Sequence, residues 1–153
     1  MAASVEAKIV NGLMTHFGGI SLPTGMRVAY PNVAFPGKDE HGEPLPMPEA
    51  GYVQLSVRHN TPIAQRVADT DTVYRGILLA VVYWPANDGL GDPTEFAATI
   101  RDYFAFDGVE RRVILHDGIE IHVGLDTAAQ LASDEQGPVY LGIPVLIPFT
   151  VYP

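Results

Sequence analysis

Apolar residues recur at the spacing of an amphipathic helix in two segments of the chain. The first prediction is a helix over residues 4–17, in which the Ser4 hydroxyl caps a free backbone N–H of the first turn. The second is a helix over residues 93–106. There we expect Asp92 to act as the N-cap, and Pro93 suits the first helical position because its missing N–H would be unpaired anyway.

Six further segments are rich in the β-branched and aromatic residues that favour strands. They are residues 27–29, 51–59, 72–84, 113–115, 119–123 and 140–151. The third segment holds the longest apolar run and is predicted to be buried on both faces in its middle. Asp117-Gly118 separates the fourth and fifth segments and predicts a tight β-hairpin, because this dipeptide accepts the positive φ angles of such a turn.

The segments between these elements carry less regular patterns. Residues 35–48 hold four prolines and residues 60–71 are polar around a Thr-Pro pair, so both are predicted as loops. Residues 126–137 are polar too, and a short helix is the one element expected there. In the last strand Pro144 and Pro148 cannot donate to a ladder, so we expect this strand at a sheet edge or interrupted by bulges.

The predicted order is one helix, three strands, one helix and three strands, without repeated βα alternation. Most consecutive strands are joined by short polar links. This order indicates an α+β fold, with a largely antiparallel (mixed) β-sheet packed on one face by two α-helices. A chain of 153 residues, 47% of them hydrophobic, is expected to form a single domain over residues 1–153.

The charge balance argues against a protein that grips nucleic acid. The chain has 9 basic and 18 acidic residues, a formal net charge of −9. Sequence-independent DNA binding depends on Lys and Arg replacing counterions along the phosphate backbone, so this chain is expected to repel DNA. Its start lacks a signal-peptide pattern, and no apolar run approaches the roughly 20 residues that cross a bilayer. We therefore expect a soluble, cytoplasmic protein.

Patterns that carry chemistry are scarce. His116, Asp117 and His122 form the one cluster that could hold a metal or act in catalysis, although a hairpin with scattered polar residues explains it equally well. The acidic residues of the 35–48 loop match no calcium-loop pattern. The chain has no cysteine, no Gly-x-Ser-x-Gly elbow and no phosphate-binding loop. We expect a protein that is not an enzyme and has no catalytic residue, cofactor or metal.

The features, taken in order over nearly the whole chain, resemble the tail terminator-like family of long-tailed phages and prophages. The resemblance rests on the N-terminal helix and on the segments AYPNVAFPG, YVQLSV, YRGILLAVVYWPANDGLGDP, GIEIHV and VYLGIPVLIPFTVY. In that family an Arg-Gly, an aromatic-Pro and a Gly-rich turn recur in one strand–turn–helix unit. Here they are Arg75-Gly76, Trp84-Pro85 and residues 89–93. The enlarged loop over residues 36–48 departs from the family.

The resemblance implies a structural protein of the virion tail. It implies a ring of six copies that binds the end of the tail tube, stops its polymerisation and offers a face to head-completion proteins. DNA would pass through without specific binding, and assembly would take place in the host cytoplasm. Two alternatives stay open: another head–tail connector, stopper or tail tube subunit, and a small metal-binding hydrolase that uses the His116, Asp117 and His122 cluster.

Eight residues are candidates for the interface with another subunit or partner. Four are arginines, scarce cations that could pair with a neighbour's carboxylates. The others are aromatic residues at strand ends or lie on the proline-bearing last strand, whose free edge could pair with the next subunit. The candidates are Arg58, Arg66, Trp84, Arg111, Arg112, Tyr140, Ile143 and Val145. The loops over residues 35–48 and 60–71 are further contact candidates.

Overall fold

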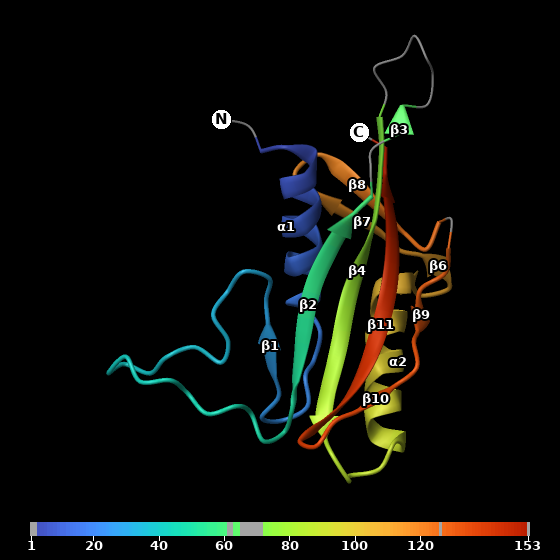
Figure 1. Ribbon diagram of the computed structural model, residues 1–153. Helices are drawn as coiled ribbons and strands as arrows, with labels where there is room; N and C mark the ends of the chain where they lie inside the picture. Colours follow the sequence, from blue (N-terminus) through green and yellow to red (C-terminus); the bar gives the residue numbers. More distant parts are fainter. Residues whose placement is uncertain (1–2, 61–62, 65–71, 126, 153) are drawn as a thin grey trace.

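The computed structural model describes residues 3–60, 63–64, 72–125 and 127–152 (Figure 1). The helices are α1 (Val5–Phe17) and α2 (Gly91–Ala105). Three long strands, β2 (Tyr52–His59), β4 (Thr72–Pro85) and β11 (Tyr140–Val151), lie side by side. The shorter strands are β1 (Arg27–Ala29), β3 (Ile63–Ala64), β5 (Phe106–Asp107), β6 (Glu110–Arg111), β7 (Val113–His116), β8 (Ile119–Val123), β9 (Gln130–Leu131) and β10 (Glu135–Gln136).

Most strands belong to one sheet with the order β1-β2-β4-β11-β8-β7. β1 runs parallel to β2, whereas β2, β4, β11, β8 and β7 pair antiparallel with their neighbours. β4 and β11 pair over all 12 residues of β11. The prediction of an α+β fold with a mixed, largely antiparallel sheet and two helices is confirmed.

Both helices pack on one face of this sheet, behind the long strands in Figure 1. α1 lies against β7 and β8, and α2 lies mainly against β11. Alternate residues of the long strands point into this layer, so a cross-strand row such as Leu55, Ala80 and Val145 is buried. The helices bury Ile9, Leu13, Phe17, Phe96, Ala97, Ile100 and Phe104 in the same core. None of the helices in the described residues is long and apolar enough to span a membrane.

Local signals in the sequence are confirmed at α1 and at the β7–β8 hairpin. The Ser4 hydroxyl accepts a hydrogen bond of 3.2 Å from the backbone N–H of Ala7, and the helix ends at Phe17. At the hairpin, Asp117 and Gly118 have φ angles of 46° and 81°. These are the left-handed conformations that a tight two-residue turn requires.

The start of α2 differs from the prediction. The helix begins at Gly91, its N-cap is Leu90 without a side-chain hydrogen bond, and Asp92 lies inside the first turn. The prediction of Asp92 as the cap is therefore wrong. Pro93 is nevertheless accommodated, because the first four N–H groups of a helix have no intrahelical partner. The charge of Asp92 also interacts favourably with the positive end of the helix dipole.

Three segments predicted without strands contain short ones, and the β5–β6 hairpin is one of them. In residues 126–137 the described part forms β9 and β10 instead of a helix, and both pair with β11. In residues 60–71 the described Ile63–Ala64 forms β3, which pairs with the start of β4. A two-residue strand carries no periodic pattern, so such pairs follow from the neighbouring long strand rather than from their own sequence.

The last strand is central rather than at an edge. β11 pairs with β4 on one side and with β8, β9 and β10 on the other. The Pro144 carbonyl accepts from Ala132 N–H, and the Pro148 carbonyl accepts from Gly124 N–H. Because the nitrogen and carbonyl of a strand residue face the same neighbour, both prolines face the short strands and the ladder to β4 loses nothing. The hydrogen-bond ladder is therefore interrupted only between β11 and the short strands β8, β9 and β10.

Candidate functional site

The sheet face opposite the helices carries apolar side chains that neither helix covers. β4 and β11 contribute three each, and the register places them as three cross-strand pairs. We call this patch the open face; it consists of Ile77, Leu79, Val81, Pro144, Leu146 and Pro148, all half-buried. A contiguous apolar patch, unlike scattered single residues, marks a surface for contact with another protein.

Two hollows lie on the open face. One, of about 380 Å³, is lined by Val81 and Pro144 and by residues 135–137. The other, of about 180 Å³, is lined by Ile77 and Pro148 together with Thr127. Apolar side chains and backbone make up much of both linings, which suits the side chains of another protein better than it suits catalysis.

Three tyrosines stand at one end of the open face. The rings of Tyr52 and Tyr83 stack with centroids 4.6 Å apart, and Tyr140 meets Tyr52 edge-on at 5.4 Å. Burial raises the pKa of Tyr52, and the charges of Tyr83 and Tyr140 raise it further because a phenolate there would face like charges. Tyr52 is thus held neutral, and the cluster acts in packing.

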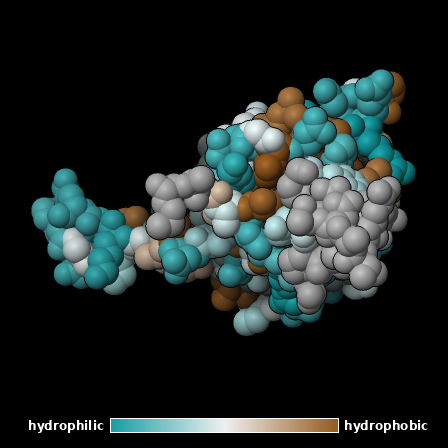
Figure 2. Space-filling view, turned by 90° about the horizontal axis from the view of Figure 1, so that it is seen from above, coloured by the Kyte–Doolittle hydropathy of each residue, from teal (hydrophilic) through white to brown (hydrophobic). Residues whose placement is uncertain are grey.

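The chain between β1 and β2, residues 30–50, forms an arm that leaves the body at the β1 edge of the sheet (Figures 1 and 2). Its base is fixed by several contacts. Phe35 packs on Tyr52 with centroids 4.9 Å apart, and the Arg27 guanidinium lies 5.3 Å from the Phe35 ring centre. Arg27 also donates a 2.8 Å hydrogen bond to the Pro36 carbonyl. Figure 2 shows that the far end of the arm is mostly hydrophilic.

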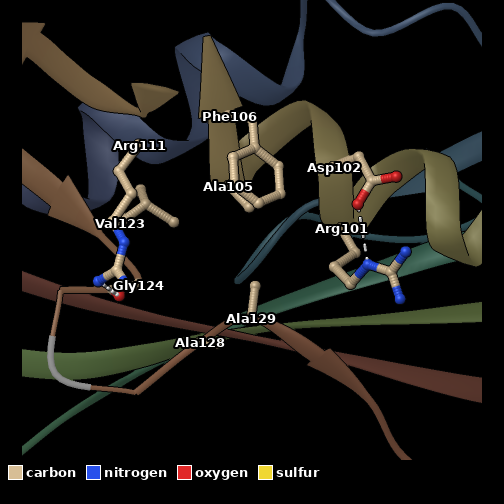
Figure 3. A pocket seen from close by; sticks show the side chains of 9 residues that line it. All are labelled: Arg101, Asp102, Ala105, Phe106, Arg111, Val123, Gly124, Ala128 and Ala129. Atoms are coloured by element: carbon tan, nitrogen blue, oxygen red, sulfur yellow. Dashed lines mark hydrogen bonds and ion pairs between the residues drawn. The ribbon is translucent and has the colours of Figure 1, made fainter. Parts of the chain in front are cut away.

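A pocket of about 320 Å³ lies where α2 ends, and we call it the helix-end pocket (Figure 3). Its lining is Arg101, Asp102, Ala105, Phe106, Arg111, Val123, Gly124, Ala128 and Ala129. The pocket is not predicted from the sequence, because no pattern of alternating apolar residues indicates the β5–β6 hairpin that lines it. Gly108, with a φ of 65°, opens the two-residue turn of that hairpin, so the Asp107-Gly108 pair was the available signal.

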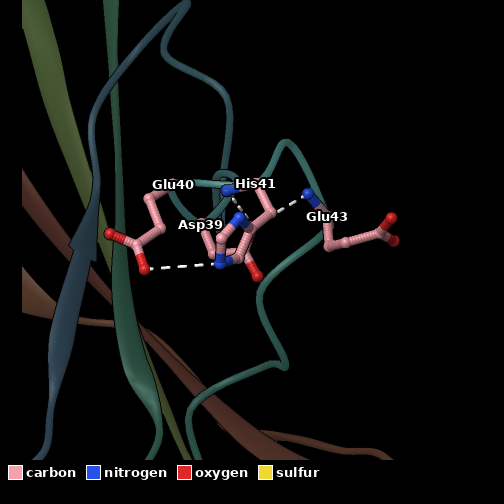
Figure 4. Close-up of polar contacts among 4 residues, drawn as sticks. All are labelled: Asp39, Glu40, His41 and Glu43. Atoms are coloured by element: carbon pink, nitrogen blue, oxygen red, sulfur yellow. Dashed lines mark hydrogen bonds and ion pairs between the residues drawn. The ribbon is translucent and has the colours of Figure 1, made fainter.

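The acidic residues at the tip of the arm do not converge on a cation site (Figure 4). Asp39 Oδ1 accepts hydrogen bonds of 2.9 Å from the backbone N–H groups of His41 and Glu43. Glu40 lies 3.4 Å from the His41 ring, while Glu43 extends away from the turn. Nowhere in the described part of the chain do three His, Asp or Glu side chains gather as metal ligands.

The His116, Asp117 and His122 cluster is not brought together. His116 pairs with Ile119 and points towards α1, where its Cβ lies beside Gly12. His122 pairs with Val113 on the other face of the hairpin and lies 3.6 Å from Glu120. The register explains this, since residues an odd number of positions apart on a strand face opposite sides. The metal-binding hydrolase alternative therefore loses its site.

The candidate arginines are dispersed. Arg58 is exposed at the margin of the open face, and Arg66 lies outside the described residues. Arg111 donates to the carbonyls of Gly124 and Leu125, at 2.6 and 3.1 Å. Arg112 donates to the Phe106 carbonyl at 2.9 Å. Arg111 and Arg112 thus bind backbone oxygens of their own chain, and these contacts hold the segments around the helix-end pocket.

The other candidates divide between surface and core. Trp84 is half-buried and donates to Asp88 at 3.1 Å, while the Tyr140 hydroxyl donates to the Pro48 carbonyl at 2.7 Å. Ile143 and Val145 are 3% and 0% exposed and pack beneath the helices. Their side chains therefore lie in the core and offer no contact surface, because these positions of β11 face the helices.

Comparison with known proteins identifies a family and a similar fold. Residues 8–149 match a family model described as phage tail terminator protein. A solved structure is similar at a TM-score of 0.64 and 21% identity, covering 96% of this chain and 92% of the other, and this likeness supports the fold alone. No curated protein matches the chain. The family match covers almost the whole core, so the chain belongs to the phage tail terminator protein family, whose role in phage tail assembly is structural.

Proposed function

We propose that this protein forms a ring that caps the end of the tail tube, stops tube polymerisation and provides the surface for joining the head. The ring contains six copies, as the family resemblance implies. The protein acts by contact alone and is not an enzyme. It is assembled onto the tail in the host cytoplasm.

The observation that carries this proposal is the open face. In a monomer the six side chains of the open face are only half-buried, so they stabilise the fold less than core side chains do. A protein that works by assembly gains from them, because such a face contributes favourable free energy once another protein covers it. The net charge of −9 suits a ring through which DNA passes without being held.

Tube growth in the presence of the purified protein tests the proposal. Negative-stain images of tail tube protein polymerised with the chain are expected to show tubes of limited length with a ring at the end. Leu146→Lys places a charge in the middle of the open face, so capping should be lost while circular dichroism still reports a folded protein. Thr99→Lys adds the same charge at an exposed position on α2 and should cap normally.

Two results would contradict the proposal. If tubes grow equally long with and without the wild-type protein, the capping function is excluded. If the protein is instead incorporated along the tube wall, it is a tube subunit. If Leu146→Lys still caps tubes, the capping function stands but the open face is not the surface that carries it.

A further inference from the structure

The helix-end pocket combines an apolar floor with two guanidinium groups. Figure 3 shows Ala105, Phe106 and Ala129 between Arg101 on one side and Arg111 on the other. Phe106 remains 45% exposed, so its ring still has apolar surface that another protein could cover. Arg101 is bound to the neighbouring Asp102 at 2.9 Å, an exposed pair that costs little to rearrange.

The β5–β6 hairpin separates charge between its two faces. Phe106 pairs with Arg111, and Asp107 pairs with Glu110. Cross-strand partners share a face and successive residues alternate, so Phe106 and Arg111 face the pocket while the two carboxylates face away. The pocket therefore holds two arginines and one carboxylate, on a chain whose formal net charge is −9. The exposed Arg111 binds the Gly124 and Leu125 carbonyls through Nη1, so Nε and Nη2 are the groups that can meet a partner's carboxylate.

The tip of the arm has the complementary chemistry. Glu40 and Glu43 are exposed there, with Leu45 and the 42% exposed Met47 following in the chain. The tip is held in one shape, because Asp39 bonds two backbone N–H groups and the Leu45 N–H donates to the Gly37 carbonyl at 3.0 Å. A preorganised loop loses less conformational entropy on binding.

The arm cannot serve the pocket of its own chain. The arm leaves the sheet beside β1, whereas the helix-end pocket is lined by residues of β6 and β8. Figure 1 shows the arm and β6 on opposite sides of the molecule. Contact between two different surfaces at opposite sides is head-to-tail, and such a contact forms a ring where the rotation between copies closes.

We propose that the arm tip of one copy binds the helix-end pocket of the next copy. The carboxylates of Glu40 and Glu43 meet the guanidinium groups of Arg101 and Arg111, and the apolar side chains that follow them cover Phe106. This contact rests on the proposed ring and assigns which two surfaces join its subunits.

Charge reversal and its rescue test the contact in the full chain. Glu40→Lys with Glu43→Lys, or Arg101→Glu alone, should raise the concentration needed for half-assembly at least about tenfold in sedimentation velocity. Combining the arm and pocket variants should recover most of the loss. Glu95→Lys, an exposed reversal outside both surfaces, is the matched control and should assemble normally. Phe106→Ala, which changes no charge, should also weaken assembly. Added salt should weaken assembly of the wild-type protein, because it screens the charge pairs.

The outcomes separate this contact from the ring itself. Rings whose stability is unchanged in the arm, Arg101→Glu and Phe106→Ala variants overturn the contact and leave the ring standing. Loss of assembly without rescue in the combined variant overturns the pairing of these two surfaces. If the wild-type protein stays monomeric both in solution and on tail tubes, both the proposed ring and the proposed contact are wrong.

Discussion

The hydroxyl of Tyr140 donates a 2.7 Å hydrogen bond to the carbonyl of Pro48, a residue 92 positions earlier in the chain. The bond joins the first residue of β11 to the returning limb of the arm. Together with the packing of Phe35 on Tyr52, it orients the arm relative to the sheet. The direction of the arm is therefore set by the core strands and not by the arm itself.

Removing this hydroxyl should loosen the arm. Tyr140→Phe keeps the ring packed against Tyr52 and is expected to lower the free energy of unfolding by about 1 kcal/mol, the usual net value of one hydrogen bond. Protease cleavage within residues 36–48 should become faster at the same time. Tyr152→Phe is the control, because the described residues offer its hydroxyl no hydrogen bond, and it should leave urea denaturation and cleavage unchanged. Cleavage at the wild-type rate in Tyr140→Phe would show that the bond does not hold the arm.

Gly76 is required by close packing. A Cβ at this position would overlap the carbonyl oxygen of Arg58 and lie 2.6 Å from Cζ of the buried Phe149 ring. Neither can move without disturbing the β2–β4 ladder or the core, so Gly76→Ala should cost at least about 3 kcal/mol or prevent folding. At Gly91, by contrast, an added Cβ meets open space in the first turn of α2. Gly91→Ala should therefore keep or raise stability, by up to about 1 kcal/mol, in the same thermal melts.

His16 links the two helices and should make stability depend on pH. Its ring stacks on Tyr103 at 4.5 Å, and the Tyr103 hydroxyl donates to the His16 carbonyl at 2.7 Å. Burial lowers the pKa of His16 below the usual 6.5; a hydrogen bond with the Tyr103 carbonyl opposes this shift, and the charge of Arg112 adds to it. Below about pH 6.5 the unfolded chain thus binds a proton that the folded chain does not, and stability falls.

Urea denaturation at pH 7.5 and 5.5 measures this effect. In the wild type, the free energy of unfolding should decrease as the pH falls through this window, and the decrease should be smaller in His16→Gln. The exposed His41→Gln variant should keep the wild-type dependence. Equal dependence in His16→Gln and wild type would mean that His16 protonates alike in both states.

Sequence reasoning succeeded where one segment determines its own structure. The Ser4 cap, the Asp117-Gly118 turn and the long apolar strand are all decided by residues close together in the chain. It failed where a distant neighbour decides. β11 can be central despite Pro144 because the proline nitrogen faces the short strands and not β4. The sequence does not show which neighbour that nitrogen faces.

The candidate site shows the same division. Charge alone favours the arginines as contacts, but Arg111 and Arg112 bind backbone carbonyls of their own chain, whose positions only the fold defines. The open face could not be predicted from the sequence for the same reason. The apolar run of β4 predicts burial on both faces, and this is wrong for Ile77, Leu79 and Val81, because the helices cover only the other face.

Neighbouring residues of β4 test whether that face is open. Leu78 is fully buried beneath the helices, whereas Leu79 points to the open face and is half-buried. Leu78→Ala leaves a cavity and should lower the free energy of unfolding by about 3 kcal/mol, while Leu79→Ala in the free protein should cost about 1 kcal/mol. Equal losses under conditions where the protein is monomeric would mean that the face is covered. In assembled rings or capped tubes the Leu79 variant should lose more, because the side chain then contacts a partner.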